Sequence, residues 1–443
     1  MSLFESRKNR GSRNSGSRRR TAFTLETLEV RSLLSAAPVI QWAMAPQIFL
    51  DPNHGNEPDL PNTPAYVNPP SRYGVLLNAA HSTGISPRTT FAWTVINSVG
   101  QTTALSGEHP SINLPQGTYT VKLTATGLSK STRPLSVTTK IQVKDVLIVS
   151  IGDSYASGEG NPVVRGVFFP EWAYSPNPAM NLENADAHRS TITGSAEFAL
   201  ALQRSNPHQA VTFVSVAASG ASIPEGLLGP MASIGDSSYV LQPQLTELKQ
   251  IIGNRHIDVL TISVGGDDLG FVTLVEDLIG NTTLGTPLLA SIQSFVNTGL
   301  SALPGHYAAL DQALESFDPG QVLITPYPDL TRDQHGKVAA IKELGVTAIS
   351  KADAQFASQD IIAPLNSVMA AAAGSYHWTL VPGITSDFRT HGYPSTSSWF
   401  RTLDESLAIE GSRDGVFHPN AAGQQDIAKR LLGAYLESLD KSK

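Results

Sequence analysis

Short apolar runs alternate with helix-length segments from residue 145 to the end of the chain. The runs are rich in Val and Ile and apolar at consecutive positions, which is typical of strands buried on both faces. They lie at 146–152, 211–217, 259–265, 322–328 and 378–382. Helices are expected at 191–206, 241–253, 305–317, 350–374 and 421–438. This order predicts an α/β fold for residues 145–443, a three-layer α/β/α sandwich around a five-stranded parallel sheet.

The preceding stretch, residues 37–144, follows a different period. After a Pro- and Asn-rich entry at 51–70, apolar and polar residues alternate at 91–95, 119–123 and 137–143, as in half-buried strands. Turn signals at Gly84 and Gly117 separate the runs, so a small antiparallel β-sandwich is predicted. Only Lys144 and Asp145 separate the last of these runs from the α/β region. The two domains should therefore be closely coupled.

Residues 1–36 are basic and unlike the rest of the chain. They hold eight Lys and Arg against three Asp and Glu, largely among Ser, Gly and Asn, a composition that predicts disorder and a targeting role. The whole chain of 443 residues carries a formal charge of -7, which argues against nucleic acid as a partner. No transmembrane span is expected, because the longest stretch without a charged residue, 278–310, is interrupted by Pro and amide side chains.

Candidate catalytic residues follow the ends of the expected strands, where active sites of open α/β sheets lie. Ser154 stands among small residues in GDSYASGEG (152–160), and Asp153 is expected to support that turn. Gly220 follows the second run, Asp267 follows the third in Gly-Gly-Asp-Asp, and His418 precedes the last helix in DGVFHPN (414–420). A Ser and a His are the two side chains that acyl transfer by an activated hydroxyl needs.

Other chemistries are not supported by the residue types present. The chain has no Cys, which excludes a thiol nucleophile and cysteine metal sites. The remaining His residues show neither helical metal-ligand spacing nor an HExxH arrangement, so no catalytic metal is expected. GDSYASGEG lacks the GK[ST] ending of a phosphate loop, so no nucleotide is expected and no cofactor is implied.

In this order the four motifs resemble the four blocks of the SGNH (GDSL) hydrolase family. IGDSYASGEG, AASGAS, ISVGGDDLGF, the His-Arg-Ser at 188–190 and DGVFHPNAAGQ are similar to the branch of secreted actinobacterial lipases, esterases and phospholipases. The resemblance implies that Ser154 is the nucleophile, that His418 is general base and then acid, and that the backbone N–H groups of Ser154 and Gly220 are oxyanion donors. The Cys that this branch often carries near Ala187 and Ala218 is replaced, so disulfide support is not expected.

Two positions depart from the family pattern. Asp267 stands where the family has an Asn that donates to the oxyanion. It could be protonated, it could turn away, or two backbone donors could suffice, and we expect reduced activity. The acid of the triad normally lies three residues before the His, where this chain has Gly415. The Gly415 carbonyl, in a dyad, and the Asp414 carboxylate, in a triad, are equal alternatives for orienting His418.

Two further resemblances concern the N-terminal part of the chain. Residues 25–36, LETLEVRSLLSA, resemble the LEPR-type motif of planctomycete exported proteins, which implies export to the cell surface or the medium. LLNAAHSTG, FAWTVINSVG and LPQGTYTVKLTAT resemble PKD-like or Ig-like modules. As such a module, residues 37–144 would be a spacer or would contact a cell surface or polysaccharide.

These observations predict an exported serine esterase or lipase acting on a small-molecule or lipid ester through an acyl-enzyme. Carbohydrate O-acyl esterase activity is the alternative enzyme function, and a catalytically impaired surface adhesion protein is the alternative of another class. Two sets of apolar residues could line an acyl pocket, although a helical stripe such as the second set is more often ordinary core. They are Phe168, Phe169, Trp172 and Tyr174, and then Leu288, Ile292, Phe295, Val296, Leu300 and Leu303.

Overall fold

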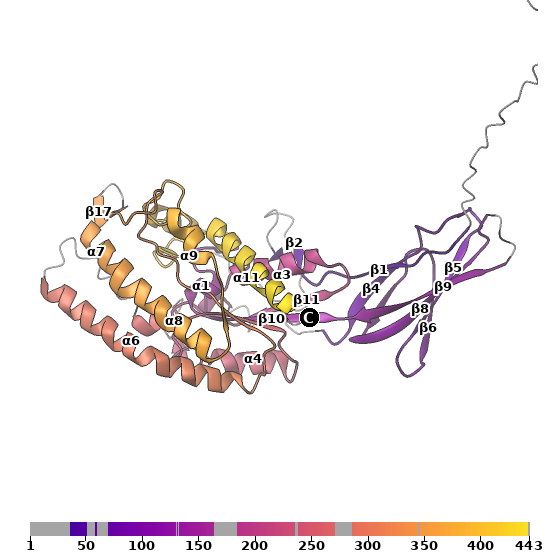
Figure 1. Ribbon diagram of the computed structural model, residues 1–443, viewed down its shortest axis with the longest axis horizontal. Coiled ribbons are helices and arrows are strands. Elements are labelled where there is room, and N and C mark those ends of the chain that lie inside the picture. The colour runs from indigo at the N-terminus through magenta and orange to yellow at the C-terminus, as the bar shows by residue number, and fades with distance from the viewer. Residues whose placement is uncertain are drawn as a thin grey trace, which may run out of the picture.

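The computed structural model describes residues 36–50, 58–59, 70–129, 131, 133–163, 184–234, 238–270, 286–343 and 346–441. A β region and an α/β region follow one another along the long axis of the molecule (Figure 1). The basic segment, the part up to residue 35 of the segment that resembles an export motif, and most of the Pro- and Asn-rich entry lie outside the described residues.

The β region consists of two antiparallel sheets, as predicted. One has the order β1-β4-β7 and the other β6-β5-β8-β9, and their inner faces share one buried apolar cluster. Trp93 is 1% exposed within it, and its Nε1 donates to the Gly107 carbonyl at 2.8 Å. The strands are β1 (Gln41–Met44), β4 (Tyr73–Asn78), β5 (Thr90–Ile96), β6 (Thr102–Ser106), β7 (Ser111–Leu114), β8 (Gly117–Thr126) and β9 (Leu135–Val143).

Five parallel strands form the sheet of the α/β region, which confirms the predicted fold class. Their order is β11-β10-β14-β15-β18, and every residue of β10, β11 and β14 is buried. The fourth strand ends at Ile324 rather than at 328, because Pro326 and Pro328 have no N–H to continue the ladder. The strands are β10 (Asp145–Gly152), β11 (Ala210–Ser215), β14 (Val259–Ser263), β15 (Val322–Ile324) and β18 (Thr379–Leu380).

Helices cover both faces of this sheet. Helices α3 and α11 pack together over one face, and α6 and α8 over the other (Figure 1). The segment predicted as 305–317 belongs to a longer helix that begins at Thr286 and continues through Pro304, because Ile292, Val296 and Leu303 are buried in the core. The long helices are α3 (Gly194–Ser205), α4 (Gln244–Ile252), α6 (Thr286–Leu314) and α11 (Ala421–Lys441).

The helix predicted at 350–374 is interrupted by one π-helical turn. It consists of α7 (Lys351–Phe356), the π turn η4 (Ala357–Ile362) and α8 (Ala363–Ser375). The turn ends at Ile362, and the Ala363 N–H reaches the Ser358 carbonyl. Pro364, at the start of α8, has no N–H to donate. The shorter elements are β2 (Phe49–Leu50), β3 (Pro58–Asp59), β12 (Met231–Ala232), β13 (Val240–Leu241), β16 (Ile341–Glu343), β17 (Val346–Ile349), α9 (Ile384–Asp387), η5 (Phe388–Thr390) and α10 (Leu403–Ile409).

The two regions are joined by direct contacts as well as by the chain. Only Lys144 separates β9 from β10. The buried Asp145 carboxylate accepts from Thr212 Oγ1 at 3.0 Å and from the Tyr73 hydroxyl at 3.4 Å, and pairs with Arg255. Over the described ranges, no helix combines the length and the hydropathy that crossing a bilayer requires.

Candidate active site

Ser154 lies at the carboxyl edge of the sheet, directly after β10. Gly152 ends this strand with φ 140°, and a Cβ there would lie 2.0 Å from the Ser263 carbonyl oxygen, so only glycine fits. The Asp153 carboxylate then accepts from the Tyr155 N–H at 3.0 Å and caps the short helix α1 (Ser154–Ser157). Ser154 is partly exposed, so the strand-to-helix turn presents its hydroxyl.

His418 reaches Ser154 from the other end of the chain. Its Nε2 lies 2.7 Å from Ser154 Oγ, and the residue is 8% exposed. The preceding residue, Phe417, has φ 67°, a left-handed conformation that is uncommon for a bulky side chain. The Tyr155 hydroxyl donates to the Phe417 carbonyl at 3.0 Å and so holds this strained turn against α1.

Asp414 and Gly415 take different places around His418. Asp414 is exposed, and its carboxylate has no hydrogen bond to His418 among the contacts of the described residues. The Gly415 carbonyl accepts from the His418 backbone N–H at 3.2 Å. Burial lowers the pKa of His418 below its usual value, while the charge of Glu159 and then the Gly415 carbonyl act in the opposite direction. Among the described residues His418 Nδ1 has no hydrogen-bond partner, so neither Asp414 nor Gly415 orients the ring by a hydrogen bond, and both the dyad and the triad stay predictions.

Glu410 supports the loop before His418 and was missed from the sequence. Its Oε1 accepts from the Gly415 N–H at 2.6 Å and from Ser406 Oγ at 2.8 Å. A Cβ on residue 415 would lie 2.2 Å from this oxygen. Burial and the neighbouring Glu159 raise the pKa of Glu410 to about 8, so this carboxyl is largely neutral at pH 7. No sequence motif separates it from an ordinary surface Glu.

Two backbone N–H groups are available for an oxyanion. Those of Ser154 and Gly220 donate to no acceptor within the described ranges. The turn that carries Gly220, with φ 81°, is held on either side, because the Ser219 N–H donates to Ala187 and the Ala221 N–H to Ala218. These are the donors that the family resemblance implied.

Asp267 begins the short helix η3 (Asp267–Leu269) after β14. Burial, and next the charge of Asp268, raise the pKa of Asp267 to about 7. Asp268 itself is engaged elsewhere, because it pairs with His306 Nδ1 at 2.6 Å and accepts from the Ile223 N–H at 3.1 Å. Asp267 is therefore protonated in a substantial fraction of molecules near neutral pH and can then donate a hydrogen bond.

Tyr327 hydrogen-bonds to Asp153 and helps to position it, a role that the sequence did not reveal. Its hydroxyl donates to Asp153 Oδ2 and accepts from the Gly266 N–H at 2.9 Å. Burial, and next the charge of Asp267, raise the pKa of Asp153 well above its usual value. Asp153 thus supports the turn, as the sequence predicted.

The apolar residues proposed for an acyl pocket are divided between core and surface. Ile292, Val296 and Leu303 are at most 3% exposed and belong to the core. Phe295 is 51% exposed, and its ring is the group that a Cβ on Gly270, just after η3, would meet. The aromatic residues at 168–174 and the side chain of Leu288 lie outside the described residues.

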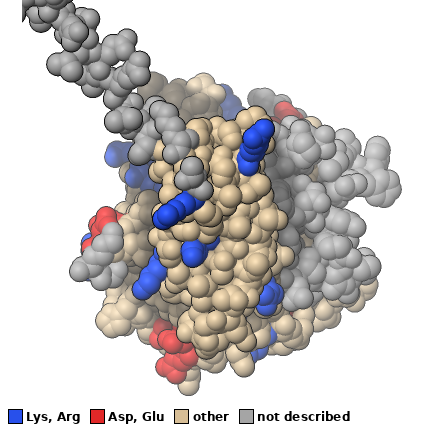
Figure 2. Space-filling model, turned by 90° about the vertical axis from the view of Figure 1, so that its right-hand side faces the viewer, with Lys and Arg blue, Asp and Glu red and all other residues tan. Residues whose placement is uncertain are grey.

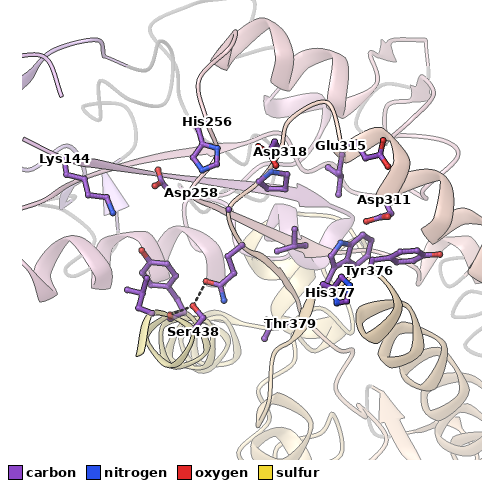
Figure 3. A pocket seen from close by; sticks show the side chains of 18 residues that line it. Lys144, His256, Asp258, Asp311, Glu315, Asp318, Tyr376, His377, Thr379 and Ser438 are labelled. Carbon is purple, nitrogen blue, oxygen red and sulfur yellow. Dashed lines mark hydrogen bonds between the residues drawn. The ribbon is translucent and has the colours of Figure 1, made fainter. Parts of the chain in front are cut away.

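A cavity lies at the opposite edge of the sheet from Ser154. It measures about 640 Å³ and lies beside the amino ends of β14, β15 and β18 (Figure 3). Its walls combine the carboxylates of Asp258, Asp311, Glu315 and Asp318 with aromatic rings. Neither Ser154 nor His418 lines it. Within the described part of the chain, no cluster of three or more His, Asp or Glu is arranged to hold a metal ion.

Comparison with known proteins gives matches of two kinds. Residues 148–431 match the family model described as GDSL-like Lipase/Acylhydrolase. No curated protein matches. Similar solved structures include a family two carbohydrate esterase from Clostridium thermocellum in complex with cellohexaose, at 12% identity and a TM-score of 0.31, covering 91% of this chain and 99% of that one.

Two other solved structures each cover about two thirds of this chain. One is a catalytic mutant of an acetylxylan esterase from Geobacillus stearothermophilus, at 12% identity and a TM-score of 0.32, covering 66% of this chain and 94% of that one. The other is a lipase from a goat rumen metagenome, at 12% identity and a TM-score of 0.34, covering 65% and 97%. The family match includes β10 from Ile148 onward, the other four strands of the parallel sheet, the turn of Ser154 and the loop of His418. The chain therefore belongs to the GDSL-like lipase/acylhydrolase family of ester hydrolases.

Proposed function

We propose that this chain hydrolyses carboxylic esters with Ser154 as nucleophile and His418 as its base. The observation that supports this most directly is the 2.7 Å contact between His418 Nε2 and Ser154 Oγ at the carboxyl edge of the sheet. A neutral imidazole within hydrogen-bond reach can take the hydroxyl proton during attack. Because burial lowers the pKa of His418, the ring is neutral at pH 7.

The reaction proceeds in two halves. Ser154 Oγ attacks the ester carbonyl carbon while its proton passes to His418 Nε2, and the tetrahedral oxyanion accepts from the N–H groups of Ser154 and Gly220. The His418 proton then goes to the leaving alkoxide as the carbon–oxygen bond breaks, which leaves an acyl-enzyme. Water attacks this acyl group while His418 takes its proton, and the proton then passes from His418 to Ser154 Oγ as the acyl carbon–oxygen bond breaks, which releases the acid and free Ser154. No external cofactor enters either half.

The direct test is hydrolysis of p-nitrophenyl esters with acyl chains from two to sixteen carbons. Ser154→Ala should abolish turnover on all of them while leaving the melting temperature nearly unchanged, because the side chain is partly exposed. Labelling of Ser154 by a fluorophosphonate, with this variant as control, tests the nucleophile without assuming a substrate. Wild-type protein that is folded but neither turns over nor labels would refute the proposal.

The chain-length profile also separates two substrate classes. An optimum on long chains would indicate a lipase, with the half-exposed Phe295 ring as one apolar contact. An optimum on acetate would favour the alternative, an esterase that removes acyl groups from carbohydrates, and release of acetate from acetylated xylan would then be the next measurement.

We also propose that the protein is exported and that its β region contacts a surface. Export is supported by the resemblance of residues 25–36 to an exported-protein motif. Residues 71–144 carry seven Lys and Arg but one Glu, whereas residues 145–443 carry 16 Lys and Arg against 31 Asp and Glu. Lys and Arg side chains are spread over the end that the β region forms (Figure 2). Opposite charge on the two regions would direct an anionic surface to the β region.

Pelleting with anionic and neutral polysaccharide particles at low and high salt tests this contact. Binding that Ser154→Ala leaves unchanged, in a protein without ester turnover, would instead favour the surface adhesion function. Fractionation of the source cells, with residues 1–36 present or deleted, tests export.

A further inference from the structure

Glu159 is a buried carboxylate beside the catalytic pair that the mechanism above does not use. It follows the C-terminal cap of α1, Gly158, and is 1% exposed. A buried carboxylate is costly unless a charged partner and hydrogen bonds compensate for lost hydration. The partners of Glu159 therefore indicate its role.

Side chains from two other segments bind this carboxylate. His188 Nδ1 lies 3.0 and 2.9 Å from its two oxygens, and Ser219 Oγ donates to Oε2. Burial alone would raise the pKa of Glu159, but the charge and hydrogen bond of His188 outweigh burial and lower it. Burial alone would lower the pKa of His188, and Glu159 raises it instead. The two side chains thus form an ion pair.

Ser219 connects this ion pair to the oxyanion donors. The residue is fully buried, and its Oγ also lies 2.9 Å from Ser157 Oγ on α1. The peptide bond that follows Ser219 carries the N–H of Gly220. Through Ser219, Glu159 therefore contacts the place where the turn of Gly220 packs against the helix that begins with Ser154.

The backbone at His188, whose side chain binds Glu159, is held in a strained conformation. Its φ of 49° is left-handed although the residue is not glycine, and such conformations persist where the surroundings impose them. Directly after it, the Arg189 N–H donates to the Asn184 carbonyl at 2.9 Å and the Ser190 N–H donates to the Ser157 carbonyl at 2.7 Å. The segment of His188 is thereby attached to α1 as well.

We propose that Glu159, anchored by His188, is a positioning residue of the oxyanion hole. Through Ser219 it fixes the Ser219–Gly220 peptide so that the Gly220 N–H points at the oxyanion formed when Ser154 attacks. The inference rests on the proposed function, since it concerns the same reaction. Glu159 itself touches neither substrate nor the reacting atoms.

Two substitutions test this role by different routes. Ser219→Ala removes one hydroxyl and leaves the Glu159–His188 pair in place, and Glu159→Gln removes the charge but keeps the side chain's size. Each should lower kcat about 10- to 100-fold, because a small misplacement of a catalytic group costs about that much. KM should stay within about twofold, since the loss falls on the transition state. The double variant should be no slower than the slower single variant, because both changes act on one contact.

Asp145→Asn is the matched control. It removes the charge of an equally buried carboxylate at the other end of β10, so it should lower the melting temperature without changing kcat. If Ser219→Ala keeps the wild-type kcat, or if the double variant shows the product of the two losses, the positioning role is wrong. Should Glu159→Gln fail to fold, Ser219→Ala alone decides.

Fluorophosphonate labelling separates failure of this inference from failure of the proposed function. If wild-type Ser154 labels and Ser219→Ala labels at the wild-type rate, the inference alone fails. If the folded wild-type protein neither labels nor turns over, both fail. Labelling slowed in parallel with kcat supports the positioning role.

Discussion

Replacing Asp267 by Asn should raise activity, by an amount that depends on pH. A protonated Asp267 can donate to the oxyanion, whereas an ionised one cannot donate and repels the developing charge. With a pKa raised to about 7, the protonated fraction is about one half at pH 7, one tenth at pH 8 and one hundredth at pH 9. An Asn donates at every pH.

The expected ratio of variant to wild type follows from these fractions. One oxyanion donor contributes about 100- to 1000-fold in rate. The ratio of kcat/KM for Asp267→Asn over wild type should therefore be close to 1 at pH 6, about 10 at pH 8 and about 100 at pH 9. The acidic limb should not move, because it reports His418, whose pKa burial lowers below its usual value.

The assay is the pH profile of kcat/KM between pH 5 and 9 on a short p-nitrophenyl ester, followed at the isosbestic wavelength of p-nitrophenol. Glu343→Gln is the matched control, because burial and next the charge of Asp404 raise the pKa of Glu343 to about 7 as well, yet it lies in β16 and has no described contact with Ser154. A ratio that does not change with pH would show that Asp267 turns away or that two backbone donors suffice. A variant slower than wild type at pH 8 would refute the reasoning outright.

Three further changes probe the groups around the catalytic pair. Asp414→Asn should cost far less than the roughly 10,000-fold lost with a triad Asp, because Asp414 is exposed; a loss of that size in kcat would restore the triad. Tyr327→Phe removes a donor to Asp153 and an acceptor for Gly266, so the free energy of unfolding should fall by about 1–3 kcal/mol, and an unchanged melting temperature would contradict the assigned contacts. Glu410→Gln should be more stable relative to wild type at pH 9 than at pH 5. The pKa of Glu410 is raised from 4.5 to about 8, so its favourable contribution is present below pH 4.5 and is lost as pH rises through 8; melting temperatures that differ from wild type equally at both pH values would argue against a raised pKa.

The fold could be predicted from the sequence because the sheet is buried on both faces. Such strands are apolar at most positions. The runs at 146–152, 211–217 and 259–265 match β10, β11 and β14, with each end differing by at most two residues. Helix α6 was predicted too short because Pro304 and the polar residues before it weaken the local signal. Burial of Ile292 and Val296 against the core outweighs that local preference.

The residues proposed to react could be identified from the sequence, but the groups that contact and support them could not. Ser154, Gly220 and His418 stand in short motifs at predictable ends of strands and helices. Tyr327 acts through a contact with Asp153, 174 residues away along the chain, and Glu410 acts through its burial. No local sequence pattern reports either feature. For Glu159 and His188 a signal existed, since both stand in the strings that carried the family resemblance.

Four carboxyl groups close to one Ser–His pair cannot all be ionised in a dry site. Glu159 is the one with a cationic partner, His188, and its pKa is lowered, whereas those of Asp153, Asp267 and Glu410 are raised, chiefly by burial. The surroundings thus divide chemically similar side chains into one charged group and three that favour the neutral form. A count of acidic residues in the sequence overstates the negative charge that an oxyanion would meet. For that reason, Asp267 in place of the family's Asn is compatible with catalysis. The rate should fall below that of Asp267→Asn only at pH values high enough to ionise Asp267.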